Sequence, residues 1–239
     1  MRKVQIIAEI GINHNGDMEL AKDLIEQAED AGADIAKFQL YDVDKLFPDQ
    51  QIIARKRNWY GLVKKTQLTK DQIFMLAEYC KKTRIGFLCS AFDTERLGWL
   101  EELGVTRHKI AYRMRNDLNY VDAVVSTGKP SIISVGNVTR FPYSSRLGKI
   151  DYLYCVPMYP TLAKDLSLDK IDFSKYSGFS DHSVGIVASM VAISRGAKII
   201  EKHFTFNRFC ELGPDHICSI EHGELRALVK FAAATEEMI

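Results

Sequence analysis

The 239-residue sequence has no long hydrophobic run and almost no excess of charge of either sign. A membrane-spanning helix needs about 20 consecutive apolar residues, so the sequence argues against a membrane partner. Lys and Arg total 32, and Asp and Glu total 31, which leaves a formal net charge of +1. This balance argues against a protein that binds nucleic acid through its overall charge, and leaves open only a local basic cleft.

Cysteine pairs are also missing. The five cysteines are odd in number and scattered, without a C-x-x-C pair, which is typical of free thiols in a reducing cytoplasm. The N-terminal segment leads directly into a short strand-like run and lacks the pattern of a signal peptide. We therefore expect a cytoplasmic protein.

Short apolar runs alternate with segments of helical period along the chain. The predicted strands cover residues 4–10, 34–40, 85–90, 108–112, 131–135, 152–156, 178–180 and 198–204. Helices are predicted at 17–31, 94–103, 184–194 and 221–237, with a further helix opened by a capping box at Thr69 and Gln72. Eight such strands, most followed by a helix, favour a TIM (β/α)8 barrel that forms a single domain over residues 1–239.

A doubly wound open sheet is the alternative fold, but no G-x-G-x-x-G turn or P-loop supports it. Two connections depart from a regular barrel. Residues 41–68 form a long polar stretch, which we interpret as a lid or insertion. Residues 137–149 leave little room for a full helix.

Polar residues gather where the predicted strands end, which is where TIM barrels place their chemistry. They are Glu9, Lys37, Gln39, Ser90, Lys109, Ser134, Tyr159, Ser180, His182, Glu201 and His203. Each of them alone could be structural, as an ion pair, a core histidine or a strand terminator. Together at one rim they favour a functional site, because unpaired charges in an apolar core are costly.

The residue types suggest a metal and a phosphate. His182 and His203 on neighbouring strands can share a divalent metal and leave positions open for water and substrate. With two protein ligands, we expect Mn²⁺, with Mg²⁺ or Co²⁺ as alternatives, rather than a closed zinc site. Lys37 and Lys109, with the serine hydroxyls, suit a phosphate. The acidic residues are candidates for proton transfer: Glu9, Glu201 and Asp215.

Five segments resemble the sialic acid synthase family, in family order across nearly the whole chain. They are Ala8–Gly16, Ala36–Gln39, Gly178–Ser183, Glu201–Thr205 and Gly213–Ser219. The resemblance implies a TIM barrel that condenses phosphoenolpyruvate with an N-acetylated sugar aldehyde, such as N-acetylmannosamine or an analogue. The products would be a nonulosonic acid and phosphate.

The resemblance also implies roles for individual residues. His182 and His203 would hold the metal, which polarises the acceptor aldehyde. Residues that match positions around phosphoenolpyruvate are Lys37, Lys109, Ser90, Ser134 and Ser180. Residues that match contacts to the acceptor or substrate are Gln39, Tyr159, Asp215 and Asn13. Glu9 and Glu201 match acidic positions beside the metal and could move protons.

Four residues depart from the family pattern, one of which is Val135, which stands in the place of a threonine after Ser134. Tyr112 stands in the place of a serine, Met114 lies near the position of an acid that holds the sugar, and Pro157 replaces an asparagine. Arg113 could supply missing charge by clamping a carboxylate or phosphate, or could be an ordinary surface arginine. Family members usually continue into an antifreeze-like domain that swaps between subunits. The sequence ends at Ile239, so a homo-oligomer of that swapped kind is not expected.

Two alternative functions stay open. One is a related carbon–carbon lyase or another phosphoenolpyruvate-using barrel with a different acceptor. The other is a binding protein of low activity that needs a partner subunit. The acceptor sugar itself is left open by the sequence.

Overall fold

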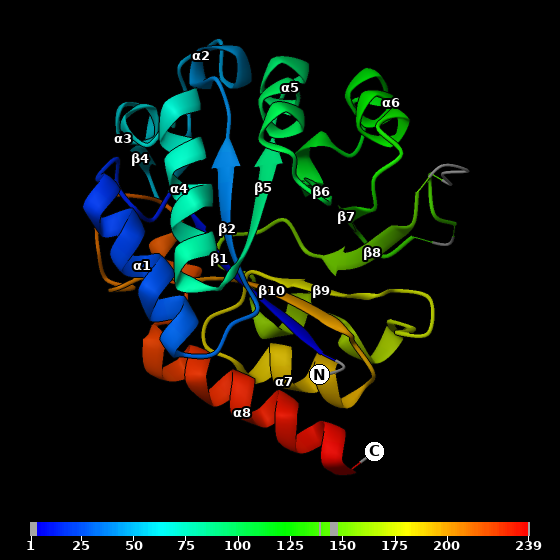
Figure 1. The fold of residues 1–239 in the computed structure, drawn as a ribbon. Coiled ribbons are helices and arrows are strands. Elements are labelled where there is room, and N and C mark those ends of the chain that lie inside the picture. Colours follow the sequence, from blue (N-terminus) through cyan, green and yellow to red (C-terminus); the bar gives the residue numbers. More distant parts are fainter. Residues whose placement is uncertain (1–3, 139, 144–147, 239) are drawn as a thin grey trace.

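The computed structural model describes residues 4–138, 140–143 and 148–238. Eight parallel strands form a closed barrel in the order β1-β10-β9-β8-β7-β6-β5-β2, surrounded by helices (Figure 1). The strands are β1 (Gln5–Gly11), β2 (Ile35–Leu40), β5 (Gly86–Ala91), β6 (His108–Ile110), β7 (Ser131–Val135), β8 (Ile150–Cys155), β9 (Gly178–Asp181) and β10 (Ile199–His203). The predicted TIM barrel is confirmed.

Among the described residues, six helices cover the barrel, and the first four of them begin at a residue whose side chain caps the helix. They are α1 (Met18–Asp30), α4 (Lys70–Thr83), α5 (Thr94–Leu103), α6 (Leu118–Ser126), α7 (Val187–Ser194) and α8 (His222–Met238). The Asp17 carboxylate caps α1 by accepting the Glu19 N–H at 2.8 Å. Both bonds of the predicted capping box between Thr69 and Gln72 are present. Each cap satisfies backbone donors that the first helical turn leaves unpaired.

Two of the βα units are irregular. The described residues between β7 and β8 form no helix, as the short connection predicted. After β8 the chain makes only 3-10 turns, at Ala163–Asp165 and Leu168–Lys170.

The fourth strand is shorter than predicted, because Tyr112–Met114 forms a 3-10 turn. Arg113 therefore lies in this turn and not on the strand that carries Lys109.

The long connection after β2, which the sequence analysis interpreted as a lid or insertion, contains secondary structure of its own. It contains α2 (Val43–Leu46), the hairpin of β3 (Ile53–Ala54) and β4 (Arg57–Asn58), and α3 (Tyr60–Lys65). In Figure 1, α2 lies beyond the arrowhead of β2, at the carboxyl end of the barrel. Within this connection the side chains of Tyr41 and Trp59 are buried, and Trp59 Nε1 donates to the Ala54 carbonyl at 3.0 Å. We call residues 41–67 the cap.

The barrel interior is apolar toward one end of its axis and polar toward the other. A ring of apolar side chains fills it toward the amino ends of the strands: Ile7, Ile35, Leu88, Ile132, Leu153 and Ile199. The carboxyl ends carry the polar residues, and a second, larger apolar cluster packs between strands and helices. Chemistry is thus confined to one end of the barrel. Within the described ranges, no helix is long and apolar enough to cross a membrane.

Candidate active site

Four charged side chains from four strands meet inside the carboxyl end of the barrel. Lys37 Nζ on β2 lies 2.5 Å from Glu9 Oε2 on β1 and 3.5 Å from Glu201 Oε2 on β10. Lys109 Nζ on β6 lies 3.6 Å from the other Glu201 oxygen. All four side chains are at most 8% exposed. The positive charges of two lysines and the negative charges of two carboxylates therefore neutralise one another in a place that bulk water does not reach. We call these four side chains the charge cluster.

Neutral donors and acceptors from other strands complete the charge cluster. Lys109 Nζ donates to Ser134 Oγ at 2.8 Å, and Ser180 Oγ donates to Glu201 at 2.8 Å. Gln39 Nε2 donates to the Glu9 carboxylate at 2.7 Å. Ser90, opposite Lys109 in the strand register, is buried and its hydroxyl has no hydrogen-bond partner in the described part of the chain. This set gives an anionic ligand both positive charge and hydroxyl donors.

Burial and charge pairing move the pKa values of the cluster in different directions. Burial alone would raise the pKa of Glu201, but Lys109 and Lys37 lower it to about 2. Burial, reinforced by the charge of Glu201, outweighs Lys37 and raises the pKa of Glu9. Burial also lowers the pKa of Lys109, and Glu201 only partly offsets this. Glu9 is therefore the carboxylate better able to take a proton, and Lys109 gives one up more readily than Lys37, whose pKa is raised.

Two histidines lie beside the charge cluster, His203 as the last residue of β10 and His182 directly after the last residue of β9. The ring centroids of His182 and His203 are 5.5 Å apart. His182 Nδ1 lies 2.9 Å from the Val156 carbonyl. Since a carbonyl only accepts, Nδ1 carries the proton and Nε2 keeps its lone pair. Burial lowers the pKa of His182 to about 4, and burial together with His182 lowers the pKa of His203 well below its usual value. Both imidazoles are neutral at pH 7, as metal ligation requires.

The histidine pair suits only some metals. Among the described residues, no group of three or more His, Cys, Asp or Glu side chains could hold a metal ion. His203 Nδ1 is buried without a hydrogen-bond partner there. Two neutral imidazoles, one of them oriented by a backbone carbonyl, fit a divalent cation that takes its other ligands from water or substrate. They do not make a closed zinc site.

An ion pair lies behind the histidines, on the opposite face of the same two strands. Lys202 Nζ is 3.2 Å from Asp181 Oδ2, and both side chains are fully buried. Lys202 and Asp181 are also register partners of β10 and β9. Asp181 further accepts from Ser189 Oγ of α7 at 2.6 Å. The strands that carry the two imidazoles are therefore joined at this level by side chains as well as by backbone.

A cavity of about 650 Å³ opens between the cap and the carboxyl end of the barrel. Of the predicted acceptor contacts, Gln39, Tyr159 and Asp215 line it. The Tyr159 ring also stacks on His182, with centroids 4.1 Å apart, so Tyr159 contacts both the cavity and the histidine pair, although neither histidine lines the cavity. Burial, aided by the charge of Glu9, raises the pKa of Asp215 to about 7. Asp215 can therefore hold or release a proton near neutral pH.

Other predicted residues take different places. Asn13 is fully buried, does not line the cavity, and donates through Nδ2 to the Phe204 carbonyl and to Ser219 Oγ, both at 2.9 Å. Its donors thus hold loops of the protein together. Met114 is buried away from the cavity, whereas Tyr112 and Pro157 line it.

The sequence analysis missed Arg115, which lines the cavity beside Arg113. No periodic pattern marks it, because it follows a 3-10 turn in which strand alternation does not apply. Its only sequence signal is a position five residues after the end of β6, within the loop that faces the active end of a barrel.

Comparisons with known proteins agree on one family. The profile described as the NeuB family matches residues 24–239. The N,N'-diacetyllegionaminic acid synthase of Legionella pneumophila is 32% identical over 98% of this chain and 72% of its own length. The N-acetylneuraminate-9-phosphate synthase of Drosophila melanogaster is 36% identical over 94% of this chain and 66% of its own. A crystal structure of the N-acetylneuraminic acid synthetase of Leptospira borgpetersenii, in complex with citrate, aligns with a TM-score of 0.86 at 32% identity, covering 98% of this chain and 84% of that one.

Proposed function

Because the chain belongs to the NeuB family, we propose that it is a metal-dependent synthase that joins phosphoenolpyruvate to an aldose. The acceptor would be an N-acetylated amino sugar, and the products a nonulosonic acid and phosphate. The observation that carries the proposal is the charge cluster beside two neutral imidazoles at the active end of the barrel. That arrangement supplies cations for an enol phosphate and a place for an aldehyde.

Lys37 and Lys109 would bind the carboxylate and phosphate of phosphoenolpyruvate. Hydroxyl groups around them would add further donors, from Ser90, Ser134 and Ser180. In the free protein, Glu9 and Glu201 neutralise the lysines, so an incoming anion competes with them. Glu9, whose pKa is raised, can take a proton and so reduce the negative charge next to the substrate.

The reaction we propose needs a proton balance as well as a new bond. C3 of phosphoenolpyruvate attacks the aldehyde carbon, whose oxygen becomes a hydroxyl. Water adds at C2 and gives up one proton, which balances the proton taken by the aldehyde oxygen. The new C2 hydroxyl then loses its proton to become the ketone oxygen as the C2–O bond to phosphate breaks, and that proton leaves with the phosphate. Of the two acidic residues, Glu9, whose pKa is raised, would accept the proton from water and return one to the departing phosphate, while Glu201 would stay ionised beside the two lysines.

His182 and His203 would hold the divalent cation, with Mn²⁺ as our first expectation. When bound, such a cation supplies Lewis-acid polarisation of the aldehyde. The protein's own part is to keep both imidazoles neutral and, through the Val156 carbonyl, to orient His182. Tyr159, stacked on His182, would form one wall for the acceptor, with Gln39 and Asp215 available to its hydroxyls.

The test is phosphate release from phosphoenolpyruvate with Mn²⁺ and a panel of N-acetylated aldoses, with the carbon–carbon product identified by mass spectrometry. We expect release with at least one acceptor, and its loss in Lys109→Met. Lys45→Met is the matched control, because Lys45 is exposed and pairs with exposed Glu95. A protein that binds Mn²⁺ and phosphoenolpyruvate but turns over no acceptor would contradict the proposal.

A second candidate is the same chemistry on another class of acceptor. Tyr112 and Pro157, which differ from the family pattern, both line the cavity. They would alter the shape of the acceptor site without touching the charge cluster. Activity restricted to aldoses that lack the N-acetyl group would favour this candidate.

A further inference from the structure

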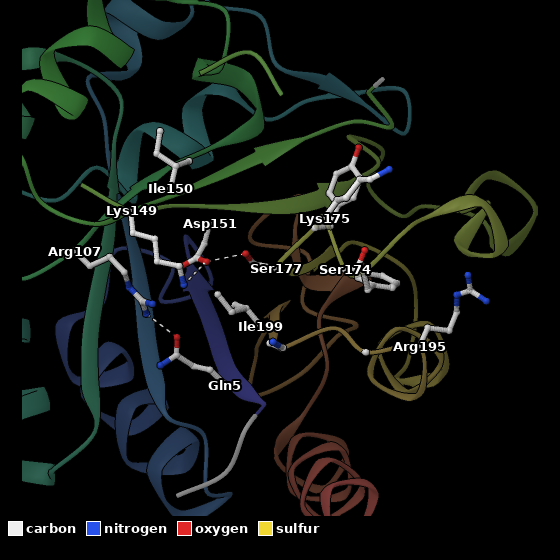
Figure 2. Close-up of a pocket in the computed structure, with 14 residues that line it drawn as sticks. Gln5, Arg107, Lys149, Ile150, Asp151, Ser174, Lys175, Ser177, Arg195 and Ile199 are labelled. Atoms are coloured by element: carbon white, nitrogen blue, oxygen red, sulfur yellow. Dashed lines mark hydrogen bonds and ion pairs between the residues drawn. The ribbon is translucent and has the colours of Figure 1, made fainter. Parts of the chain in front are cut away.

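A second cavity, of about 850 Å³, opens at the amino end of the barrel, opposite the active site. Residues at the starts of several strands line it, among them Gln5 of β1, Arg107 just before β6 and Asp151 of β8 (Figure 2). We call it the amino-end cavity. The apolar ring inside the barrel, to which Ile199 belongs, separates it from the charge cluster. Its volume is within the usual range for small-molecule sites, about 300–1,000 Å³.

The amino-end cavity carries a strong excess of positive charge. Among the described residues that line it, five are cations and one is a carboxylate. The cations are Arg107, Lys149, Lys175, Arg195 and Lys198, and the carboxylate is Asp151. The chain as a whole is almost neutral, with a net charge of +1. Charge of one sign that gathers in a hollow with protein walls creates a local field that attracts anions.

Two of the five cations are neutralised by carboxylates of the protein. Lys149 Nζ lies 2.9 Å from Asp151 Oδ1, which also accepts from Ser177 Oγ at 2.7 Å (Figure 2). Lys175 Nζ lies 3.3 Å from Asp172 Oδ2. The carboxylate that lines the cavity is therefore already engaged by a lysine and a serine.

The other three cations have no carboxylate within ion-pair distance in the ranges that the structure describes. Arg107 donates to the neutral Gln5 Oε1 at 2.7 Å, across the barrel from the start of β6 to the start of β1 (Figure 2). Arg195 donates to two backbone carbonyls, at 3.1 and 3.3 Å. Lys198 is exposed. About three positive charges are thus left without a counter-charge from the protein.

Arg107 is the cation whose surroundings point most directly to a ligand. Its side chain is half-buried, and burial lowers its pKa, which the charge of Asp151 only partly offsets. A guanidinium nevertheless stays protonated in proteins and has five N–H donors. Arg107 therefore keeps a partly desolvated positive charge with one neutral acceptor, and its remaining donors can bind an anion.

We infer that the amino-end cavity binds a small molecule with two linked phosphoryl groups on an organic body, as in a nucleoside diphosphate. Two linked phosphoryl groups carry about three negative charges at pH 7, which matches the charges of Arg107, Arg195 and Lys198. Guanidinium N–H pairs also fit phosphoryl oxygens in a bidentate manner. The apolar lining residues Ile150 and Phe173 would contact the organic body. The site lies outside the proposed reaction, because the apolar ring separates the two ends of the barrel.

Calorimetric titration of the full chain with ADP and with pyrophosphate tests this site. We expect both to bind, ADP more tightly, with an affinity that falls as salt is raised. Arg107→Gln should raise the Kd for ADP at least about ten-fold, which equals about 1.4 kcal/mol. Lys198→Met should raise it about three-fold, because an exposed charge contributes less. Arg84→Gln is the matched control, since Arg84 is an exposed arginine between α4 and β5 that does not line the cavity. Its Kd should be unchanged.

Lys109→Met distinguishes the two ends of the barrel, because it removes a cation of the charge cluster. ADP binding that persists in Lys109→Met and weakens in Arg107→Gln supports the site. Binding that is lost in Lys109→Met and unchanged in Arg107→Gln would place ADP at the active end and overturn it, as would no binding of either probe. Citrate, which has carboxylates and no phosphoryl group, should bind at least about ten-fold more weakly than pyrophosphate. Equal binding would overturn the phosphoryl assignment.

Lys198→Met also guards against a folding defect in Arg107→Gln, because Lys198 is exposed and forms no ion pair in the described part of the chain. ADP binding that is unchanged in Lys198→Met and in a folded Arg107→Gln would contradict the site. The proposed function is tested separately by phosphate release, so its failure would leave the result of these titrations unaffected.

Discussion

Replacing Glu201 with Gln should destabilise the ligand-free protein by about 3–5 kcal/mol, the usual cost of breaking a buried ion pair. Glu201 faces Lys37 at 3.5 Å and Lys109 at 3.6 Å, and an amide leaves these two charges with only Glu9 to balance them. The pKa of Glu201 falls from an ordinary 4.5 to about 2 in the folded protein, which corresponds to about 3 kcal/mol at neutral pH. The free energy expected from breaking the ion pair and the free energy that corresponds to the pKa shift are therefore of similar size.

The direction of the Glu201 pKa shift determines how the stability of the protein depends on pH. Because the folded state has the lower pKa, the Glu201 carboxylate contributes its full stabilisation above about pH 4.5 and loses it as the pH falls toward 2. Glu201→Gln removes that contribution, so the difference between variant and unmodified protein should be largest at pH 7 and should shrink below pH 4.

Urea unfolding followed by circular dichroism measures the change. Glu95→Gln is the matched control, since Glu95 pairs with Lys45 at 3.1 Å but both side chains are more than half exposed; a change under about 1 kcal/mol is expected there. The double variant Glu201→Gln with Lys109→Met removes the surplus cation and should recover part of the loss. A loss of less than about 1 kcal/mol in Glu201→Gln at pH 7 would refute the electrostatic reasoning for the charge cluster.

Further predictions concern single sites. Asp215→Asn should remove a limb near pH 7 from the kcat/KM profile, and should stabilise the protein by roughly 1–3 kcal/mol at pH 8, because burial raises the pKa of Asp215 to about 7 and its ionised form is therefore unfavourable. Unfolding at pH 8 and pH 4 checks this, since the gain should vanish at the lower pH. Gly178→Ala should cost at least about 3 kcal/mol, because the new Cβ would lie 1.8 Å from a carbonyl oxygen of β10, whereas Gly98→Ala in α5 meets nothing within 4 Å and should gain about 0.5–1 kcal/mol in thermal unfolding. His203→Asn should weaken Mn²⁺ binding at least about ten-fold by calorimetry, while His222→Asn, which changes a surface histidine bonded to Asp30, should leave it unchanged.

The fold could be predicted from the sequence where local physics decides it. Apolar runs that fill a sheet covered by helices, and caps such as Thr69 with Gln72, act over a few residues and hold in the structure. The end of β6 could not be predicted. The apolar run continues to Tyr112, but Tyr112 enters a turn, where it packs under Arg115. The cap depends on buried Tyr41 and Trp59, which contact residues distant in sequence and leave no periodic pattern.

The candidate site was predictable to the extent that barrel geometry gathers all strand ends at one rim. Glu9, Lys37 and Lys109 were expected at that rim and do meet there. The bridging position of Glu201 between two lysines could not be derived, because it depends on strand tilt and closure across the barrel. Asn13 has the residue type of a ligand contact, yet its donors serve the protein, and residue type alone does not distinguish these uses.

The buried pair of Lys202 and Asp181 ties the shape of the metal site to the folding of the sheet. If β10 slipped by one residue against β9, every side chain of β10 would change faces. Lys202 would then point into the barrel interior and His203 would point out of it. The buried charges of Lys202 and Asp181 would be separated, and no water could solvate them there. The alignment that folds best is thus also the one that sets the imidazoles side by side. A substitution at Lys202 or Asp181, neither of which contacts a ligand, would therefore weaken metal binding even though both histidines are unchanged.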